Sequence, residues 1–259
     1  MRTIKKIPLL LQARMGSSRL PEKILLPVLD KQLLKLTIER INQSKFVEEV
    51  ILLIPDASTD DILESFAIDE KIKFFRGNEK NCLDRHYQAA KYFDIDVFAK
   101  TTSDCCLIDS RVIDEVIELY FSKSPNCDYV SNICPPTFPD GLDIEIFSYT
   151  ALRSAILNSK MSSELEHVTP YISKNPQKFK LFNFQNNVDL SQMRWCVDEK
   201  EDLVFVKKIF EKLSPKFIFS MDEILKILKN EPTLLQINNK IIRDEGYLKS
   251  LKNDKKIIT

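Results

Sequence analysis

Short apolar segments alternate with amphipathic ones through the first half of the chain, and this alternation constrains the fold more than any other feature. The connections between them are short and of crossover length, which favours parallel strand pairing with right-handed crossovers. The pattern therefore predicts an α/β fold with a mostly parallel sheet flanked by helices. The expected strands are residues 9–11, 50–54, 73–75, 97–101 and 129–131, and the expected helices are residues 33–41, 60–66, 82–93 and 111–121.

The second half of the chain has a mixed pattern. No internal repeat or low-complexity linker interrupts it. We expect one large domain over residues 1–213, followed by a C-terminal helical extension over residues 214–259 that packs on it as a cap. The further expected strands are residues 144–147, 179–184 and 193–197, and the further expected helices are residues 152–158, 164–173 and 221–228.

A cationic turn follows the first apolar strand directly, and it holds three cations, two hydroxyls and one glycine. A loop that leaves the carboxyl end of a buried parallel strand opens into the ligand crevice of such folds. Because a triphosphate needs fixed positive charge and close backbone approach, the turn predicts a phosphate site. A solvated basic turn is the alternative interpretation. The expected contacts are Gln12, Ala13, Arg14, Gly16, Ser17, Ser18, Arg19 and Lys23.

Two aspartates stand where apolar runs end. Asp104 comes after residues 97–101, and Asp198 comes after residues 193–197. Transfer of a nucleotidyl group is limited by charge, and Mg²⁺ typically takes one or two protein carboxylates together with phosphate oxygens and water. Asp104 is well placed as such a ligand. For Asp198 the residues alone favour capping of the following helix, and the same role is expected of Asp109.

The cationic turn carries a family resemblance. Residues 12–28, QARMGSSRLPEKILLPV, are similar to the opening of the SpsF-like cytidylyltransferases and, more distantly, of the KDO and acylneuraminate cytidylyltransferases. In those families this loop wraps the triphosphate of CTP, with an arginine and a lysine at the positions of Arg14 and Lys23. The resemblance implies a GT-A-like nucleotidyltransferase fold that transfers CMP from CTP. It departs at Glu22, where the family usually has glycine.

Further blocks follow in family order. Residues 102–109 resemble the pattern Thr-Gly-Asp-Cys-Pro-Leu-Ile-Asp, with Ser103 and Cys106 in place of glycine and proline, and residues 194–198 resemble Arg-Trp-Thr-Val-Asp. The aspartate of the second block stands at the second metal ligand of KDO cytidylyltransferases. The resemblance therefore implies that Asp104 and Asp198 bind Mg²⁺. Together with Arg14 and Lys23, they are the expected catalytic residues.

The helix at residues 82–93 is also similar to the family, which implies that Asp84 and Arg85 face the nucleotide. A surface role within the helix is the alternative for both residues.

Residues 137–147 and 164–171 provide the expected acceptor site. Alternation along the predicted strand places Asp143 and Glu145 on one face, which could be open to water or to a crevice. The family phrase Phe-Pro-Asp-Gly favours the crevice, and the resemblance implies an acidic or amino sugar of a surface polysaccharide as acceptor. For His167, binding is preferred to general-base catalysis, with a buried structural role as the alternative. The expected contacts are Asp140, Asp143, Glu145, Glu166 and His167. Residues 237–251 resemble the tail of many SpsF-like proteins, in which no role is assigned to it.

Charge and composition exclude several other classes. The 38 basic and 38 acidic residues cancel, so no overall field favours nucleic acid or an anionic membrane. No apolar stretch approaches the roughly 20 residues that span a bilayer, and no signal-peptide pattern begins the chain, so we expect a cytoplasmic protein. The six cysteines lack zinc spacing and are expected to be reduced, with Cys105 and Cys106 in packing rather than nucleophilic roles. Related cytidylyltransferases suggest a homodimer.

Two other functions stay open. A GT-A-type glycosyltransferase using a nucleotide sugar would usually carry an Asp-x-Asp motif after the metal strand, and the chain is expected to contain no Asp-x-Asp. A non-catalytic nucleotide- or sugar-binding protein is compatible with the departures at Glu22, Ser103 and Cys106. Release of pyrophosphate distinguishes the three functions.

Overall fold

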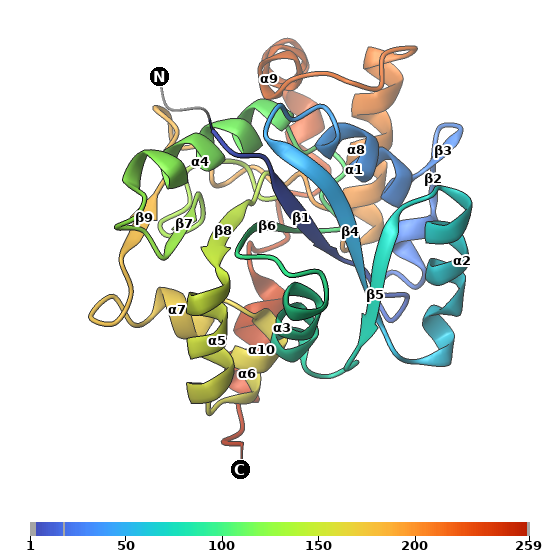
Figure 1. Cartoon of the computed structure of the whole chain (residues 1–259). Helices are drawn as coiled ribbons and strands as arrows, with labels where there is room; N and C mark the ends of the chain where they lie inside the picture. The colour runs from blue at the N-terminus through green and yellow to red at the C-terminus, as the bar shows by residue number, and fades with distance from the viewer. Residues whose placement is uncertain (1–3, 18, 258–259) are drawn as a thin grey trace.

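The computed structural model describes residues 4–17 and 19–257, and a seven-stranded sheet forms its centre (Figure 1). The strand order is β5-β4-β1-β6-β8-β7-β9, and every neighbouring pair is parallel except the two made by β8. The predicted α/β fold with a mostly parallel mixed sheet is confirmed. The strands are β1 (Ile7–Gln12), β4 (Val47–Pro55), β5 (Lys73–Gly77), β6 (Val97–Thr102), β7 (Tyr129–Ser131), β8 (Glu145–Ser148) and β9 (Leu181–Asn183), beside a small hairpin of β2 (Pro27–Val28) and β3 (Lys31–Gln32).

Helices cover both faces of the sheet because side chains along each buried strand alternate between the two faces. In β1, Leu9 and Leu11 belong to a core with α1, α2, α4, α8 and α9, whereas Leu10 belongs to a second core with α3, α5 and α7. The helices are α1 (Leu33–Ile41), α2 (Asp61–Asp69), α3 (Cys82–Tyr92), α4 (Ser110–Lys123), α5 (Tyr149–Asn158), α6 (Ser162–His167), α7 (Pro170–Ser173), α8 (Lys200–Leu213), α9 (Met221–Asn230) and α10 (Glu245–Lys252).

Residues 193–197 do not form the strand that the sequence predicted. They make only an isolated bridge between Asp140 and Arg194, because the segment packs against the Pro-Asp-Gly turn instead of joining the sheet. The Trp195 amide donates to the Asp140 carbonyl at 2.6 Å, and the Asp140 amide donates to the Met193 carbonyl at 2.9 Å. The predicted helix at residues 164–173 is likewise divided into α6 and α7 by Val168, whose φ is 70°.

The chain after α8 continues the first core and then crosses to the other side of the molecule. Ile224 and Leu228 of α9 are buried in the same core as α1 and α8, and the Arg40 guanidinium donates to the carbonyls of Phe217 and Phe219. The following segment leads to α10, which lies beside α6 (Figure 1). A domain division at residue 213 stays a prediction.

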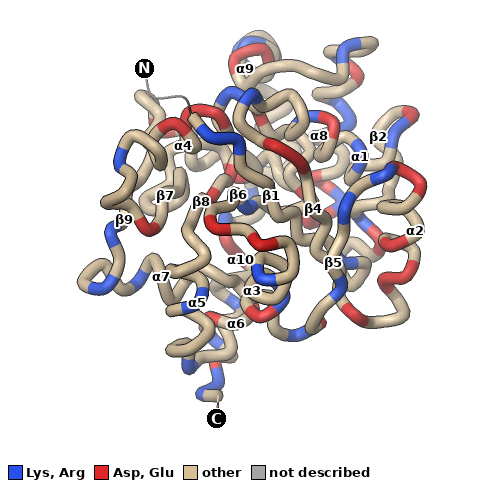
Figure 2. The backbone as a smooth tube through the Cα atoms, in the orientation of Figure 1, with Lys and Arg blue, Asp and Glu red and all other residues tan. Residues whose placement is uncertain are grey.

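Charged residues of both signs are interspersed along the elements in Figure 2, in keeping with the zero net charge. Within the described part of the chain, no helix combines the length and the apolar character needed to cross a membrane.

Gly141 allows the Pro-Asp-Gly turn to approach residues 195–196. Its φ is 110°, and a Cβ at this position would lie 2.6 Å from the Cys196 amide nitrogen and 2.7 Å from the Trp195 carbonyl carbon. We expect Gly141→Ala to lower the free energy of unfolding by about 2–4 kcal/mol, measured by chemical denaturation. Gly246→Ala is the matched control, since no atom lies within 4 Å of a Cβ there. Equal stability of the two variants would contradict this role of Gly141.

Candidate active site

A cavity of about 330 Å³ opens at the carboxyl ends of β1 and β6, and most of the predicted site residues line it. Its position agrees with the rule that ligands of such sheets bind beyond the carboxyl ends of the strands. Ser18 lies outside the described residues. The predicted residues that line the cavity are Gln12, Ala13, Arg14, Gly16, Ser17, Arg19, Lys23, Arg85, Asp104, Asp140, Asp143, Glu166, His167 and Asp198.

The turn after β1 is anchored on the side away from the cavity, and its cationic side chains face the cavity. The Met15 amide donates to the Asp60 carboxylate at 2.7 Å, which fixes the loop beside Arg14. Arg14 is exposed, and among residues 4–17 and 19–257 no carboxylate forms an ion pair with it. Glu22 adopts a φ of 57°, a conformation that favours glycine, and its exposed side chain is not part of the cavity lining.

Lys23 joins the cationic turn to the two predicted metal ligands. Its Nζ lies 2.6 Å from an Asp104 carboxylate oxygen and 2.7 Å from an Asp198 carboxylate oxygen. Burial alone would lower the pKa of Lys23, but the two carboxylates outweigh it and raise that pKa. Burial would raise the pKa of Asp198, yet Lys23, Arg19 and Arg194 lower it to about 2. The two aspartates are therefore directed at one cation, from segments 94 residues apart.

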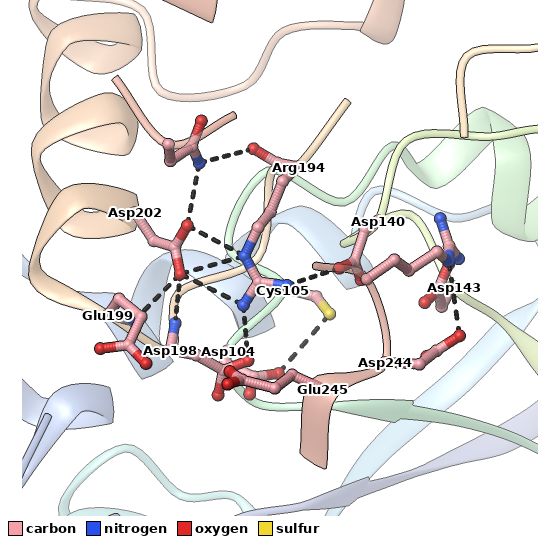
Figure 3. A network of polar contacts seen from close by, with 12 residues as sticks. Asp104, Cys105, Asp140, Asp143, Arg194, Asp198, Glu199, Asp202, Asp244 and Glu245 are labelled. Carbon is pink, nitrogen blue, oxygen red and sulfur yellow. Dashed lines mark hydrogen bonds and ion pairs between the residues drawn. The ribbon is translucent and has the colours of Figure 1, made fainter. Parts of the chain in front are cut away.

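Arg194 positions Asp198, a role that was not predicted from the sequence. Figure 3 shows its guanidinium between three carboxylates, at 2.8 Å from Asp140, 2.8 Å from Asp198 and 3.0 Å from Asp202. Glu199, not Asp198, caps α8, with Asp202 completing the capping box. Asp198 is thus free of a capping role, and its carboxylate can face the cavity. Arg194 opens the segment of residues 194–198 that resembles the family block Arg-Trp-Thr-Val-Asp, so the resemblance already contained the signal for it.

Arg19 is held by carboxylates at the edge of the cavity. Its guanidinium lies 3.0 Å from Asp198, 3.4 Å from Glu199 and 2.6 Å from Glu245 of α10. The last contact joins the first turn of the chain to its C-terminal helix.

The predicted acceptor residues do not all lie together. Asp140, Asp143, Glu166 and His167 line the cavity, whereas Glu145 does not. Glu145 is buried on the sheet, where it pairs with Lys100 and accepts hydrogen bonds from Tyr129 at 2.7 Å and Thr169 at 2.5 Å. The expectation for Glu145 fails because β8 begins at Glu145, so strand alternation does not extend back to Asp143.

Of the two residues predicted on α3 to face the nucleotide, only one lines the cavity. Arg85 lines the cavity, and its guanidinium donates to the Asn78 carbonyl at 2.6 Å. Asp84 does not line the cavity, since its side chain accepts a hydrogen bond at 3.1 Å from Gln88 on the exposed side of the same helix. For Asp84 the structure therefore favours the alternative of a surface role within α3.

Two smaller expectations concern Asp109 and the adjacent cysteines. Asp109 caps α4 as predicted, with its carboxylate accepting from the Arg111 amide at 2.9 Å. Burial raises the pKa of Cys105 well above its usual range and that of Cys106 to about 12. Both thiols therefore stay protonated, which supports packing rather than nucleophilic roles.

The expectation that the chain contains no Asp-x-Asp is wrong, because one occurs at residues 94–96, but it lies at the opposite end of β6 from the cavity. Asp94 and Asp96 precede β6, at the amino end of the strand, and line a separate pocket with Lys5 and Lys6. The cavity at the carboxyl end of β6 does not include them.

A parallel α/β sheet with a cationic turn after β1, facing two aspartates across a cavity, defines a nucleotidyltransferase-type architecture. A model of the family described as cytidylyltransferase matches residues 9–242. The chain belongs to the cytidylyltransferase family, and it is a CTP-dependent nucleotidyltransferase.

Individual proteins agree with this assignment. The structure of a cytidylyltransferase from Leptospira borgpetersenii superposes with a TM-score of 0.85 at 34% identity, over 90% of this chain and 97% of that one. An uncharacterized protein of Methanocaldococcus jannaschii is 33% identical over 93% of this chain and 98% of its own length. The spore coat polysaccharide biosynthesis protein SpsF of Bacillus subtilis is 29% identical over 86% of this chain and 94% of its own. The predicted nucleotidyltransferase fold is confirmed.

Proposed function

We propose that the protein transfers CMP from CTP to a sugar-like acceptor for a surface polysaccharide and releases pyrophosphate. The observation that carries this proposal is Lys23, which extends from the cationic turn to a point between Asp104 and Asp198. Similarity to the Bacillus subtilis SpsF protein supports the polysaccharide part.

In the proposed reaction, an acceptor hydroxyl loses its proton to solvent and its oxygen bonds to the α-phosphorus of CTP, while the bond from that phosphorus to the bridging oxygen breaks and pyrophosphate leaves. Negative charge grows on the leaving pyrophosphate. Arg14, Arg19 and Lys23 lie on one turn, so together they can neutralise that charge from a fixed position. Arg194 acts indirectly as a positioning residue, because it holds the carboxylates of Asp140 and Asp198.

The residues of the site fit a divalent metal ion such as Mg²⁺. Asp104 and Asp198 already converge on a single cation, the Lys23 ammonium group, and both offer the oxygen donors that Mg²⁺ prefers. Within residues 4–17 and 19–257, no three His, Cys, Asp or Glu side chains are arranged to hold a metal ion. An ion at Asp104 and Asp198 would take its remaining ligands from phosphate and water. When bound, the ion would supply Lewis-acid stabilisation of the phosphates.

The test is pyrophosphate release from each of the four ribonucleoside triphosphates, with and without Mg²⁺, in the presence of a panel of acidic and amino sugars. We expect release that depends on CTP, on the divalent ion and on an acceptor. CTP binding without any release would favour the non-catalytic function. Transfer from a nucleotide sugar without pyrophosphate release would favour the glycosyltransferase.

A further inference from the structure

The carboxylate of Asp198 is held in one orientation, because its two oxygens have different partners. Oδ1 lies 2.7 Å from Lys23 Nζ, at the cation position that Asp198 shares with Asp104. Oδ2 accepts a hydrogen bond at 2.8 Å from the Arg194 guanidinium. The direction in which Asp198 offers Oδ1 to a cation therefore depends on where that guanidinium lies.

Arg194 is fixed in turn by Asp202, whose side chain is fully buried. The Asp202 carboxylate lies 3.0 Å from Arg194 Nε and 3.2 Å from one of its terminal nitrogens, and it also accepts from the Asp198 amide at 3.0 Å (Figure 3). Asp202 thus holds both the guanidinium behind the Asp198 carboxylate and the main chain of Asp198 itself. A buried carboxylate needs donors for both of its oxygens, since an unsatisfied one is costly.

Asn238, in the segment between α9 and α10, provides such a donor. Its Nδ2 group donates to Asp202 Oδ1 at 2.9 Å and to the Arg194 carbonyl at 3.0 Å. Asn238 is only 4% exposed, and it is not part of the cavity lining. One side-chain amide therefore fixes the main chain of Arg194 and also the carboxylate that orients the Arg194 side chain.

The contacts of Asn238 differ from those that stabilise the start of α8. The capping box of that helix uses Asp202 Oδ2, which accepts from the Glu199 amide at 3.0 Å. Asn238 binds the other oxygen, Oδ1, which is the one that lies 3.0 Å from Arg194 Nε. Asn238 therefore acts on the Arg194 side of Asp202 and not on the end of the helix.

We propose that Asn238 is a positioning residue for the divalent-ion site, and that it acts through Asp202 and Arg194 on the orientation of Asp198. The inference rests on the proposed function. It adds that a residue outside the cavity, in the segment after α9, determines how tightly the site holds its ion. Removing a partner that orients a metal ligand typically lowers metal affinity by about 10–100-fold.

Calorimetric titration of the full chain with CTP, once in EDTA and once in Mn²⁺, tests the inference without any sugar present. The measured quantity is the factor by which Mn²⁺ tightens CTP binding. We expect Asn238→Ala to lower this factor by about tenfold or more, while the affinity for CTP in EDTA stays within about twofold. Asn239→Ala is the matched control, since it makes the same change at the exposed neighbouring residue, and it should keep the wild-type factor.

Thermal unfolding shows whether each variant is folded under the conditions of the titration. If Asn238→Ala does not fold, Asn238→Ser takes its place, because serine keeps a single donor in a smaller volume and cannot reach both acceptors. The expected direction is the same for this variant, with a smaller fall in the Mn²⁺ factor.

The wild-type titrations separate the two proposals. If CTP does not bind, or if Mn²⁺ does not tighten its binding, the proposed function fails and the inference fails with it. If Mn²⁺ does tighten CTP binding, three results would overturn the inference alone: an unchanged factor in the Asn238 variant, equal losses of CTP affinity with and without Mn²⁺, or an equal fall of the factor in Asn239→Ala.

Discussion

Asp104→Asn is expected to reduce CTP-dependent pyrophosphate release by about 10³-fold or more while leaving the fold intact. The substitution removes one of the two carboxylates directed at the cation position, and a metal-dependent transfer loses both affinity and orientation when a ligand becomes neutral. The fold should persist because the new amide side chain would retain an oxygen for the Thr102 hydroxyl, which lies 2.5 Å from Asp104, and because Lys23 keeps Asp198. Steady-state kinetics and thermal unfolding of the same preparation measure the two effects.

Asp84→Asn is the matched control for this variant. It makes the same chemical change on α3, where the carboxylate faces Gln88 and not the cavity, so the rate should remain within about twofold. Unchanged turnover of Asp104→Asn would contradict the metal assignment, and equal losses in both variants would contradict the location of the site.

Lys23→Met is expected to lower both activity and stability. Loss of one preorganised cation from the leaving-group side corresponds to about 10²–10³-fold in rate. The change also leaves Asp104 and Asp198 directed at each other, which we expect to cost about 1–3 kcal/mol of unfolding free energy at pH 7 because the three side chains are only 12–23% exposed.

The stability effect of Lys23→Met should depend on pH in a defined direction. The pKa of Asp198 is lowered to about 2 in the folded protein, from 3.8, so its ion pair contributes above pH 3.8 and is lost as the pH falls through 2. Denaturation of wild type and variant should therefore differ most above pH 5 and converge near pH 2. Lys73→Met, which breaks an exposed pair with Glu49, is the control and should change stability little at any pH. A pH-independent difference for Lys23→Met would contradict the electrostatic origin.

The sequence predicted those parts of the site whose position follows from the order of neighbouring strands and loops along the chain. A polar turn or aspartate directly after a buried parallel strand must emerge at one edge of the sheet, so Lys23 and Asp104 could be expected near each other. Asp198 was harder to predict as a site residue, because residues 193–197 form no strand. Its carboxylate reaches the cavity through packing of this segment on the Gly141 turn. The family resemblance supplied that residue, and the chain pattern did not.

The remaining residues depended on contacts between distant segments. Glu145 was expected in the acceptor site, but Lys100, Tyr129 and Thr169 surround it from three other elements. Residues 244–247 reach the cavity only because the chain returns past α6 after the first core is complete. No periodicity in residues 237–251 indicates this path, so their role could not be read from the pattern.

The ion pairs of Lys23 have a practical consequence for handling the enzyme. Lys23 is an internal counter-ion for the carboxylates of Asp104 and Asp198, so we expect the chain to fold without an added salt of a divalent ion. Preparations treated with a chelator should therefore stay folded, and adding back one divalent ion at a time would show by titration which ion the proposed site binds.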